Sequence, residues 1–190
     1  NPQLVYACAI GHLWGYSGDR GLFKTTNGGD AWTKLGGGLP NDGRTGCIDL
    51  VMHPTDPNVL YAAFYHRLRQ PWTFQSGGPN GGIFKSTDGG ATWTELTNGL
   101  PTGSNVGRIG MSVSESMPST IYAFYCDDPG YFLGVYKSTD GGDSWNATNS
   151  SGLSSLTSSF GWYFGQVRVD PTNPARVFVL GVPFYRTQNG

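Results

Sequence analysis

The chain has 190 residues, 30 of them glycine, with 14% aromatic residues and a formal net charge of −1. This balance argues against a nucleic-acid partner, whose binding would require a basic stripe. Neither a long apolar span nor a signal peptide is present, so we expect no transmembrane segment, and from the start at Asn1 we expect a processed or partial chain. Short apolar runs between Gly- and Pro-rich turns predict an all-β protein.

The first predicted unit covers residues 1–35 and lacks an inner strand. It opens with the apolar run Leu-Val-Tyr-Ala-Cys-Ala-Ile before residue 11, which we expect to form a strand buried on both faces. A loop over residues 11–20 leads into a β-hairpin whose turn begins at Asn27. Asn-Gly between two apolar runs is a strong hairpin signal.

The second predicted unit covers residues 45–97. It begins with an inner strand over Cys47–Met52, a proline turn over residues 53–58 and a strand over Val59–Tyr65. The insertion His66–Gly81 is the longest in the chain, and we expect it to be a loop. A second hairpin with an Asp-Gly-Gly turn follows.

The third unit, residues 106–149, and the fourth, residues 164–190, repeat this plan. Arg108–Val113 and Thr120–Tyr125 are the expected first strands of the third unit, which ends in a hairpin. Gly165–Val169 and Arg176–Val182 are the corresponding strands of the fourth unit, which lacks its outer strand. All these strands have ordinary lengths.

The hairpin turns repeat one set of chemical roles. A Ser or Thr and an Asp or Asn accept hydrogen bonds from turn N–H groups, glycines permit positive φ, and a Trp anchors the hairpin against its sheet. The residues in these roles are Thr25, Asn27, Gly29, Trp32, Ser86, Asp88, Gly90, Trp93, Ser138, Asp140, Gly142 and Trp145. We therefore expect Asp88 and Asp140 to be structural residues.

The spacing of these turns predicts the architecture. They recur every 49 to 61 residues, counted between Asn27, Asp88, Asp140 and Asn189. Four-stranded antiparallel sheets at this spacing are typical of the blades of a β-propeller. We expect residues 1–190 to form a single propeller segment, with two complete blades flanked by two partial ones, that is part of a larger ring.

The turn sequence also carries a family resemblance. Ser/Thr-x-Asp/Asn-x-Gly-x-x-Trp resembles the Asp-box, or BNR repeat, of sialidases, sortilin-type propellers and xyloglucan-cleaving glycoside hydrolases. Gly11–Gly15, Arg44–Gly46, Gln70–Trp72, Gly107–Gly110 and Trp162–Tyr163 are similar to segments of large secreted bacterial proteins with sortilin-like repeats, often labelled glycosyl hydrolases. The resemblance covers essentially the whole chain and implies an extracellular or periplasmic location. It implies a fold more than an activity, because enzymes and non-enzymes share the motif.

In a four-stranded blade, the box turns and proline turns lie on one face of the ring and the variable loops on the other. We expect recognition of a glycan or peptide on the loop side, because loops on a rigid scaffold carry most binding sites. The candidate binding residues are His12, Trp14, Arg20, Asp42, Arg44, His66, Arg67, Arg69, Trp72, Asp127, Tyr131 and Trp162. In the alternative interpretation, these aromatic residues pack the loops together and the arginines are solvated or pair with nearby acids.

No catalytic residues are assigned from the sequence. A glycosidase needs two carboxyl groups about 5–10 Å apart, and no motif pairs Asp42, Asp49 or Asp127. His12 and His66 lack the spacing of metal ligands, so we expect neither a metal nor a cofactor.

The cysteines Cys8, Cys47 and Cys126 occupy non-equivalent repeat positions, which favours small buried thiols; one disulfide with one thiol left over is the alternative. The sequence favours an exported binding or assembly module, whose partners are further blades or partner subunits. The rival hypothesis is part of a glycoside hydrolase of the xyloglucanase or sialidase type, with a site completed by missing blades. A third is a subunit that docks on a larger complex through unpaired blade edges.

Overall fold

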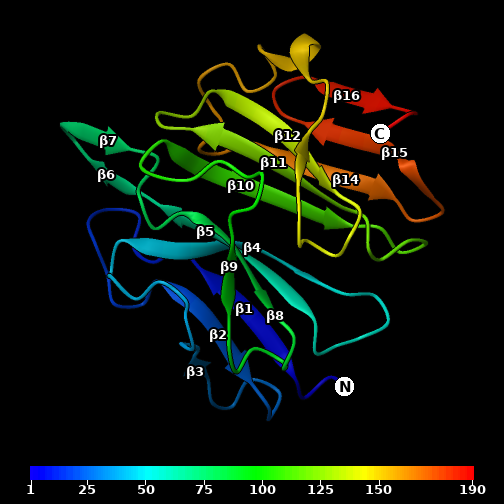
Figure 1. Ribbon diagram of the computed structural model, residues 1–190. Helices are drawn as coiled ribbons and strands as arrows, with labels where there is room; N and C mark the ends of the chain where they lie inside the picture. The colour runs from blue at the N-terminus through cyan, green and yellow to red at the C-terminus, as the bar shows by residue number, and fades with distance from the viewer.

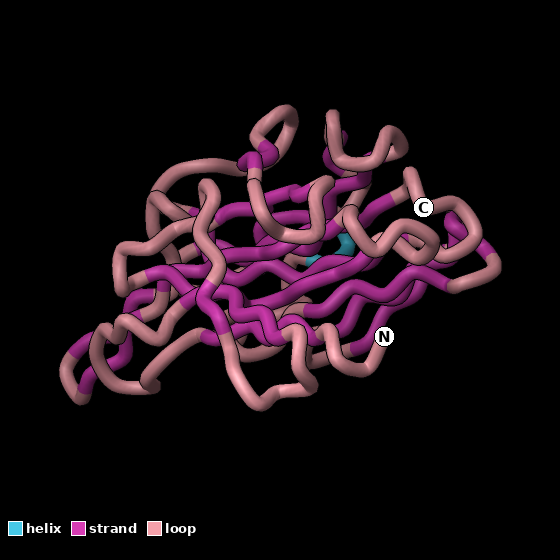
Figure 2. The backbone as a smooth tube through the Cα atoms, turned by 90° about the horizontal axis from the view of Figure 1, so that it is seen from below, coloured by secondary structure: helices cyan, strands magenta, loops and turns pink.

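The computed structural model describes all 190 residues as four small antiparallel sheets that follow one another along the chain. Figure 1 shows the sheets fanned from the N-terminal strands to the C-terminal ones. Viewed at 90° to this direction, strands fill the middle of the molecule and loops project at both ends (Figure 2). No helix is long and apolar enough to cross a membrane.

The first sheet has three strands and the second has four, each in meander order. The first contains β1 (Val5–Ala9), β2 (Gly21–Thr25) and β3 (Thr33–Lys34). The second contains β4 (Thr45–Met52), β5 (Leu60–His66), β8 (Gly82–Ser86) and β9 (Thr94–Leu96). Between β5 and β8, the short strands β6 (Leu68–Gln70) and β7 (Thr73–Gln75) form a hairpin of their own.

The third sheet has four strands and the fourth has three. The third contains β10 (Val106–Val113), β11 (Ile121–Asp127), β12 (Phe132–Ser138) and β13 (Asn146–Ala147). The fourth contains β14 (Gln166–Asp170), β15 (Asn173–Leu180) and β16 (Phe184–Thr187). A single 3-10 turn, η1 (Ser151–Leu153), lies between them. The all-β prediction of two complete and two partial blades is confirmed.

Three apolar clusters join the sheets, and the second strand of each complete blade contributes residues to two of them. Leu60, Ala62 and Phe64 of β5 pack in the cluster shared with the first sheet. Tyr61 and Ala63, one position on, pack in the cluster shared with the third sheet. Successive strand residues point to opposite faces, so a strand between two sheets is apolar at every position. The same alternation along β11 links the third sheet to the fourth.

The predicted burial of the first strand is wrong. Val5 and Cys8 of β1 are exposed, because only one face of the first sheet packs against another sheet of the chain. The expected burial of all three cysteines therefore fails at Cys8, whereas Cys47 and Cys126 are buried; none of the three forms a disulfide. The insertion after β5 also differs from the expected loop, since it contains β6 and β7.

Candidate functional site

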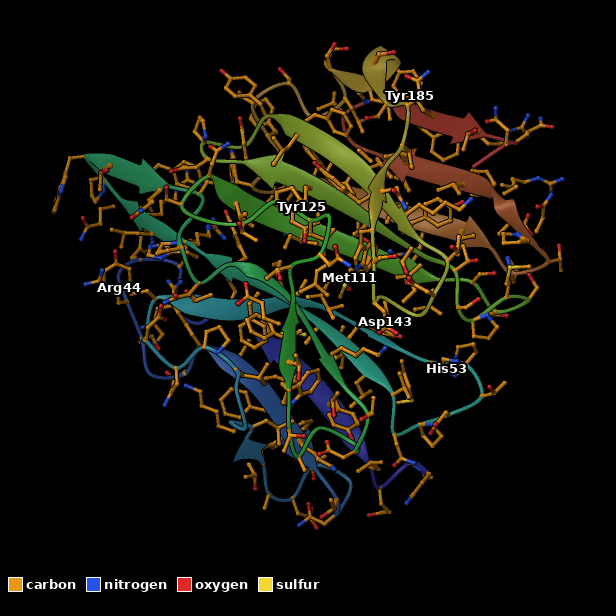
Figure 3. The ribbon with its side chains drawn as sticks, viewed as in Figure 1. Arg44, His53, Met111, Tyr125, Asp143 and Tyr185 are labelled. Carbon is orange, nitrogen blue, oxygen red and sulfur yellow. The ribbon has the colours of Figure 1, made fainter.

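The proline turns and the hairpin turns meet at one end of the blades. Within the second sheet the Gly89 amide donates to the Asn58 carbonyl at 3.0 Å, and within the third the Gly141 amide donates to the Ser119 carbonyl at 2.9 Å. The variable loops lie at the opposite end. In Figure 3, Arg44 lies at the end from which β6 and β7 project and His53 of a proline turn at the other. We call these the box end and the loop end.

The turn of the second sheet shows the chemistry of the box end. The Ser86 hydroxyl accepts from the Gly90 amide at 2.9 Å and donates to an Asp88 oxygen at 2.8 Å. Asp88 in turn accepts from the Thr92 amide and hydroxyl. The Trp93 indole donates to the Gly90 carbonyl at 3.0 Å. Ser138, Asp140, Gly142 and Trp145 repeat these contacts in the third sheet.

Hydrogen bonds within the turns keep these two aspartates ionised. The hydrogen bonds from the Thr92 hydroxyl and amide, with that from Ser86, lower the pKa of Asp88 to about 2. Ser144 and Ser138 lower the pKa of Asp140 in the same way. Both carboxylates therefore stay ionised and serve the turn, as carboxylates that accept several N–H and O–H bonds do.

Tyrosines on the second strands tie each blade to the next one. The Tyr6 hydroxyl donates to the Gly89 carbonyl at 2.9 Å, and the Tyr61 hydroxyl donates to the Gly141 carbonyl at 2.8 Å. A lysine opposite each tyrosine covers its ring: Lys24 lies 5.3 Å from the Tyr6 centroid. In the fourth sheet the equivalent residue is Phe178, which has no hydroxyl group.

Arg20 of the predicted binding set is a structural residue at the loop end. It is 1% exposed, and its guanidinium donates to the carbonyls of Arg44 at 2.6 Å and Gly15 at 3.0 Å. Burial lowers the pKa of Arg20. Arg20 thus fixes the loop over residues 11–20 against the start of β4 and has little surface to offer a ligand.

His66 is also buried, at 4% exposure, because it is the last residue of β5 and not the first residue of a loop. The Tyr16 ring meets the His66 imidazole edge-on with centroids 5.9 Å apart, and the Arg44 guanidinium lies 5.0 Å from the centroid of the same Tyr16 ring. The His66 Nε2 atom has no hydrogen-bond partner. Burial lowers the pKa of His66, which favours the neutral imidazole.

Arginines and aromatic side chains from three separate loops meet beside this region. The Arg67 guanidinium lies 5.4 Å and that of Arg69 lies 5.1 Å from the Trp162 ring centroid. Arg69 also lies 5.7 Å from the Trp14 ring. Phe74 of β7 meets Trp162 edge-on at 5.2 Å. We call Trp14, Arg67, Arg69, Phe74 and Trp162 the arginine–aromatic cluster.

An open hollow of about 400 Å³ adjoins this cluster. It is bounded by Arg69, Phe74 and Trp162 together with the β6–β7 turn, whose Trp72 is 79% exposed. The volume is within the range of small-molecule sites. Phe74 was absent from the candidates drawn from the sequence, and the alternation Thr-Phe-Gln after Trp72 is the only signal that could have placed it on a strand face.

The carboxylates of Asp42 and Asp127 at this end of the molecule accept hydrogen bonds from nearby backbone amides, and Asp42 also accepts one from the insertion after β5. Asp42 accepts from the amides of Arg44 and Thr45 at 2.8 and 2.7 Å and from Asn80 at 2.8 Å. Burial alone would raise the pKa of Asp42, but these hydrogen bonds lower this pKa to about 2. Asp127 accepts from the Tyr131 amide at 2.6 Å.

Asp49 has a structural contact between blades. Its two carboxylate oxygens accept from the Leu50 amide at 3.0 Å and from the Met111 amide of the neighbouring inner strand at 2.8 Å. Asp49 and Asp127 are therefore both committed to backbone amides of the chain. The remaining candidates, His12 and Tyr131, are exposed, and His12 pairs with Asp19 at 3.5 Å. No group of His, Cys, Asp and Glu side chains is arranged to hold a metal.

Comparison with known proteins supports the fold. No family model matches the chain. A curated xyloglucanase from a Paenibacillus species is 26% identical over 177 residues, an alignment that covers 77% of this chain and 15% of that protein. The chain therefore spans only a small part of this relative.

Solved structures give the same result. A GH74 xyloglucanase from Xanthomonas campestris superposes with a TM-score of 0.60 at 18% identity, covering 88% of this chain and 24% of the other. An ancestral GH74 enzyme gives 0.60 at 20% identity, covering 100% and 24%. A NanB sialidase variant from Streptococcus pneumoniae gives 0.51 at 17%, covering 83% and 23%. These proteins are β-propellers, and the similarity establishes the same blade architecture for this chain.

Proposed function

We propose that the chain is a segment of an exported β-propeller that binds a glycan through its loop end, with further blades completing the ring. The observation that supports this proposal is the arginine–aromatic cluster, where side chains from three connections of the chain meet beside a hollow. Indole rings offer a broad apolar surface on which a sugar ring can stack. Arginines offer directed hydrogen-bond donors for the polar groups of the sugar. The proposal thus adds a binding function to the fold that the Asp-box resemblance implies.

The test compares two exposed tryptophans at opposite ends of the blades. Trp72 is 79% exposed beside the hollow, and Trp32 is 44% exposed at the box end. Binding of the full-length protein to immobilised polysaccharides should weaken at least about fivefold in Trp72→Ala, since a stacked ring contributes of the order of 1–3 kcal/mol. Trp32→Ala is the matched control and should bind normally. Equal binding by both variants would refute the proposal.

The rival function is hydrolysis of a polysaccharide backbone, which the 26% identity to a xyloglucanase favours. The hydrogen bonds of Asp42, Asp49 and Asp127 support binding over hydrolysis, because each carboxylate is committed to backbone amides. Xyloglucan turnover by the full-length protein should be unchanged in each Asp→Asn variant. Turnover abolished by one of these changes would establish the hydrolase and assign its carboxylate.

A further inference from the structure

The unpaired hydrogen-bond donors at the loop end identify the charge of the ligand. The chain has eight arginines, and five of them, Arg20, Arg44, Arg67, Arg69 and Arg108, belong to this end. None of the five forms an ion pair; the chain's ion pairs are His12–Asp19, Lys85–Asp143 and Arg176–Asp170. Arg20 donates to backbone carbonyls, but the side chains of the other four donate to no acceptor of the chain, although guanidinium groups normally find carboxylate or carbonyl acceptors.

Arg67 and Arg108 are the clearest cases. The Nε atom of each is buried and has no hydrogen-bond partner, and neither guanidinium donates to any acceptor of the protein. Arg108 is at the start of β10, in the third blade, whereas Arg67 directly follows β5 of the second. Burial foremost, and to a smaller extent the charge of Arg67, lower the pKa of Arg108, whereas the charge of Asp49 raises it.

The nearby acids do not neutralise these arginines. Asp42 and Asp127 accept from backbone amides close to them in the sequence, Asp49 accepts from the Leu50 and Met111 amides, and Asp128 accepts from the Ser76 amide at 2.9 Å. His66 is 4% exposed, and its Nε2 atom is another buried polar atom that has no hydrogen-bond partner. An anion brought in by a ligand would supply the missing acceptors.

We propose that the loop-end site takes a polysaccharide that carries carboxylates, a polyuronate, with Arg67, Arg69 and Arg108 receiving the carboxylates and Trp72 and Trp162 receiving sugar rings. A carboxylate matches the planar fork of a guanidinium. Arg67 and Arg69 both lie against Trp162, which places charge recognition and ring contact side by side. The inference rests on the proposed function and adds the charge of the glycan.

An acidic peptide offers the same charge, but the geometry favours the glycan. Peptides are held by strand addition at a sheet edge, by pockets for anchoring side chains or, for acidic motifs, by arginine clusters. The hollow beside Arg69 adds to its arginine an open wall of aromatic rings, with Trp72 79% exposed at its margin. Such a surface suits the broad faces of sugar rings.

The test measures binding of the full-length protein to polygalacturonate by calorimetry. The probes for comparison are polygalacturonate with its carboxyl groups reduced to alcohols, xyloglucan and poly-glutamate. We expect binding to polygalacturonate alone, weakened by added salt. Arg69→Gln should weaken it about tenfold or more, the loss of a charged hydrogen bond. Arg69→Lys should fall between, because it keeps the charge and loses the fork.

The control for overall charge is Arg186→Gln, an exposed arginine at the box end that should bind normally. Equal weakening by Arg186→Gln would reduce the effect to non-specific charge and overturn the inference. Equal or tighter binding of poly-glutamate would overturn it in favour of an acidic peptide. Equal binding of the carboxyl-reduced polymer or xyloglucan would overturn the charge assignment while leaving the proposed function intact. If no polysaccharide binds, the proposed function fails as well.

Discussion

The Ser86 hydroxyl offers the most direct test of how the box end is held together. It is buried, it accepts from the Gly90 amide at 2.9 Å, and no other acceptor reaches that amide. Ser86→Ala leaves a buried N–H group unpaired, which costs about 1–3 kcal/mol. Asp88 loses one donor but keeps those of Thr92, so its contribution changes little. We expect the total destabilisation to stay within about 1–3 kcal/mol.

Hydrogen exchange at the Gly90 amide is the matching assay, because it reports local opening of the turn as well as global unfolding. Protection should fall roughly 5- to 150-fold in Ser86→Ala. Ser86→Thr is the control, since Thr25 fills this role in the first turn and accepts from the Gly29 amide at 3.1 Å. The threonine variant should stay within about 0.5 kcal/mol of the parent. Unchanged Gly90 protection in the alanine variant would refute the account of the turn.

Three further predictions follow from the contacts between and within blades. Tyr61→Phe removes the hydroxyl bond to the Gly141 carbonyl and should lower the unfolding free energy by about 0.5–1.5 kcal/mol; a larger loss would mean that the ring packing also changed. The pKa of Asp42 is about 2 when folded against about 3.9 when unfolded, so its stabilisation is complete above about pH 5 and lost as pH falls through 2. Titrating unfolding free energy should show about 1–2 kcal/mol of this loss, allowing for solvent screening, and Asp42→Asn should abolish that share. Iodoacetamide should label Cys8 in the folded protein but Cys126, whose burial raises its pKa to about 12, only after unfolding; rapid labelling of Cys126 would contradict its burial.

The repeating turns were readable in the sequence because their chemistry is local. Asp88, Gly89 and Gly90 adopt their turn through contacts within a few residues, and both glycines have positive φ. Once the turns are placed, the apolar run of β5 follows as a strand between two sheets. The blade architecture can therefore be predicted from short-range sequence signals alone, without comparison to a known relative.

The loop end was less predictable because its contacts join residues distant in the sequence. Nothing near Arg20 indicates that the Arg44 carbonyl, 24 positions away, accepts from its guanidinium. The strands β6 and β7 are three residues each, too short to leave a clear alternation. The sequence predicts a loop at His66 because an insertion starts there, whereas pairing with Thr45 extends the strand by one residue.

The β6–β7 hairpin pairs with no strand of the four sheets, and its ladder closes on itself through Leu68–Gln75, Arg69–Phe74 and Gln70–Thr73. Its tip can therefore be lengthened, shortened or replaced without breaking a blade. Both evolution and protein engineering can therefore change the binding specificity at this tip without changing how the blades fold. Libraries randomised at this tip, displayed on the unaltered sheets, are a practical route to new binders from this scaffold.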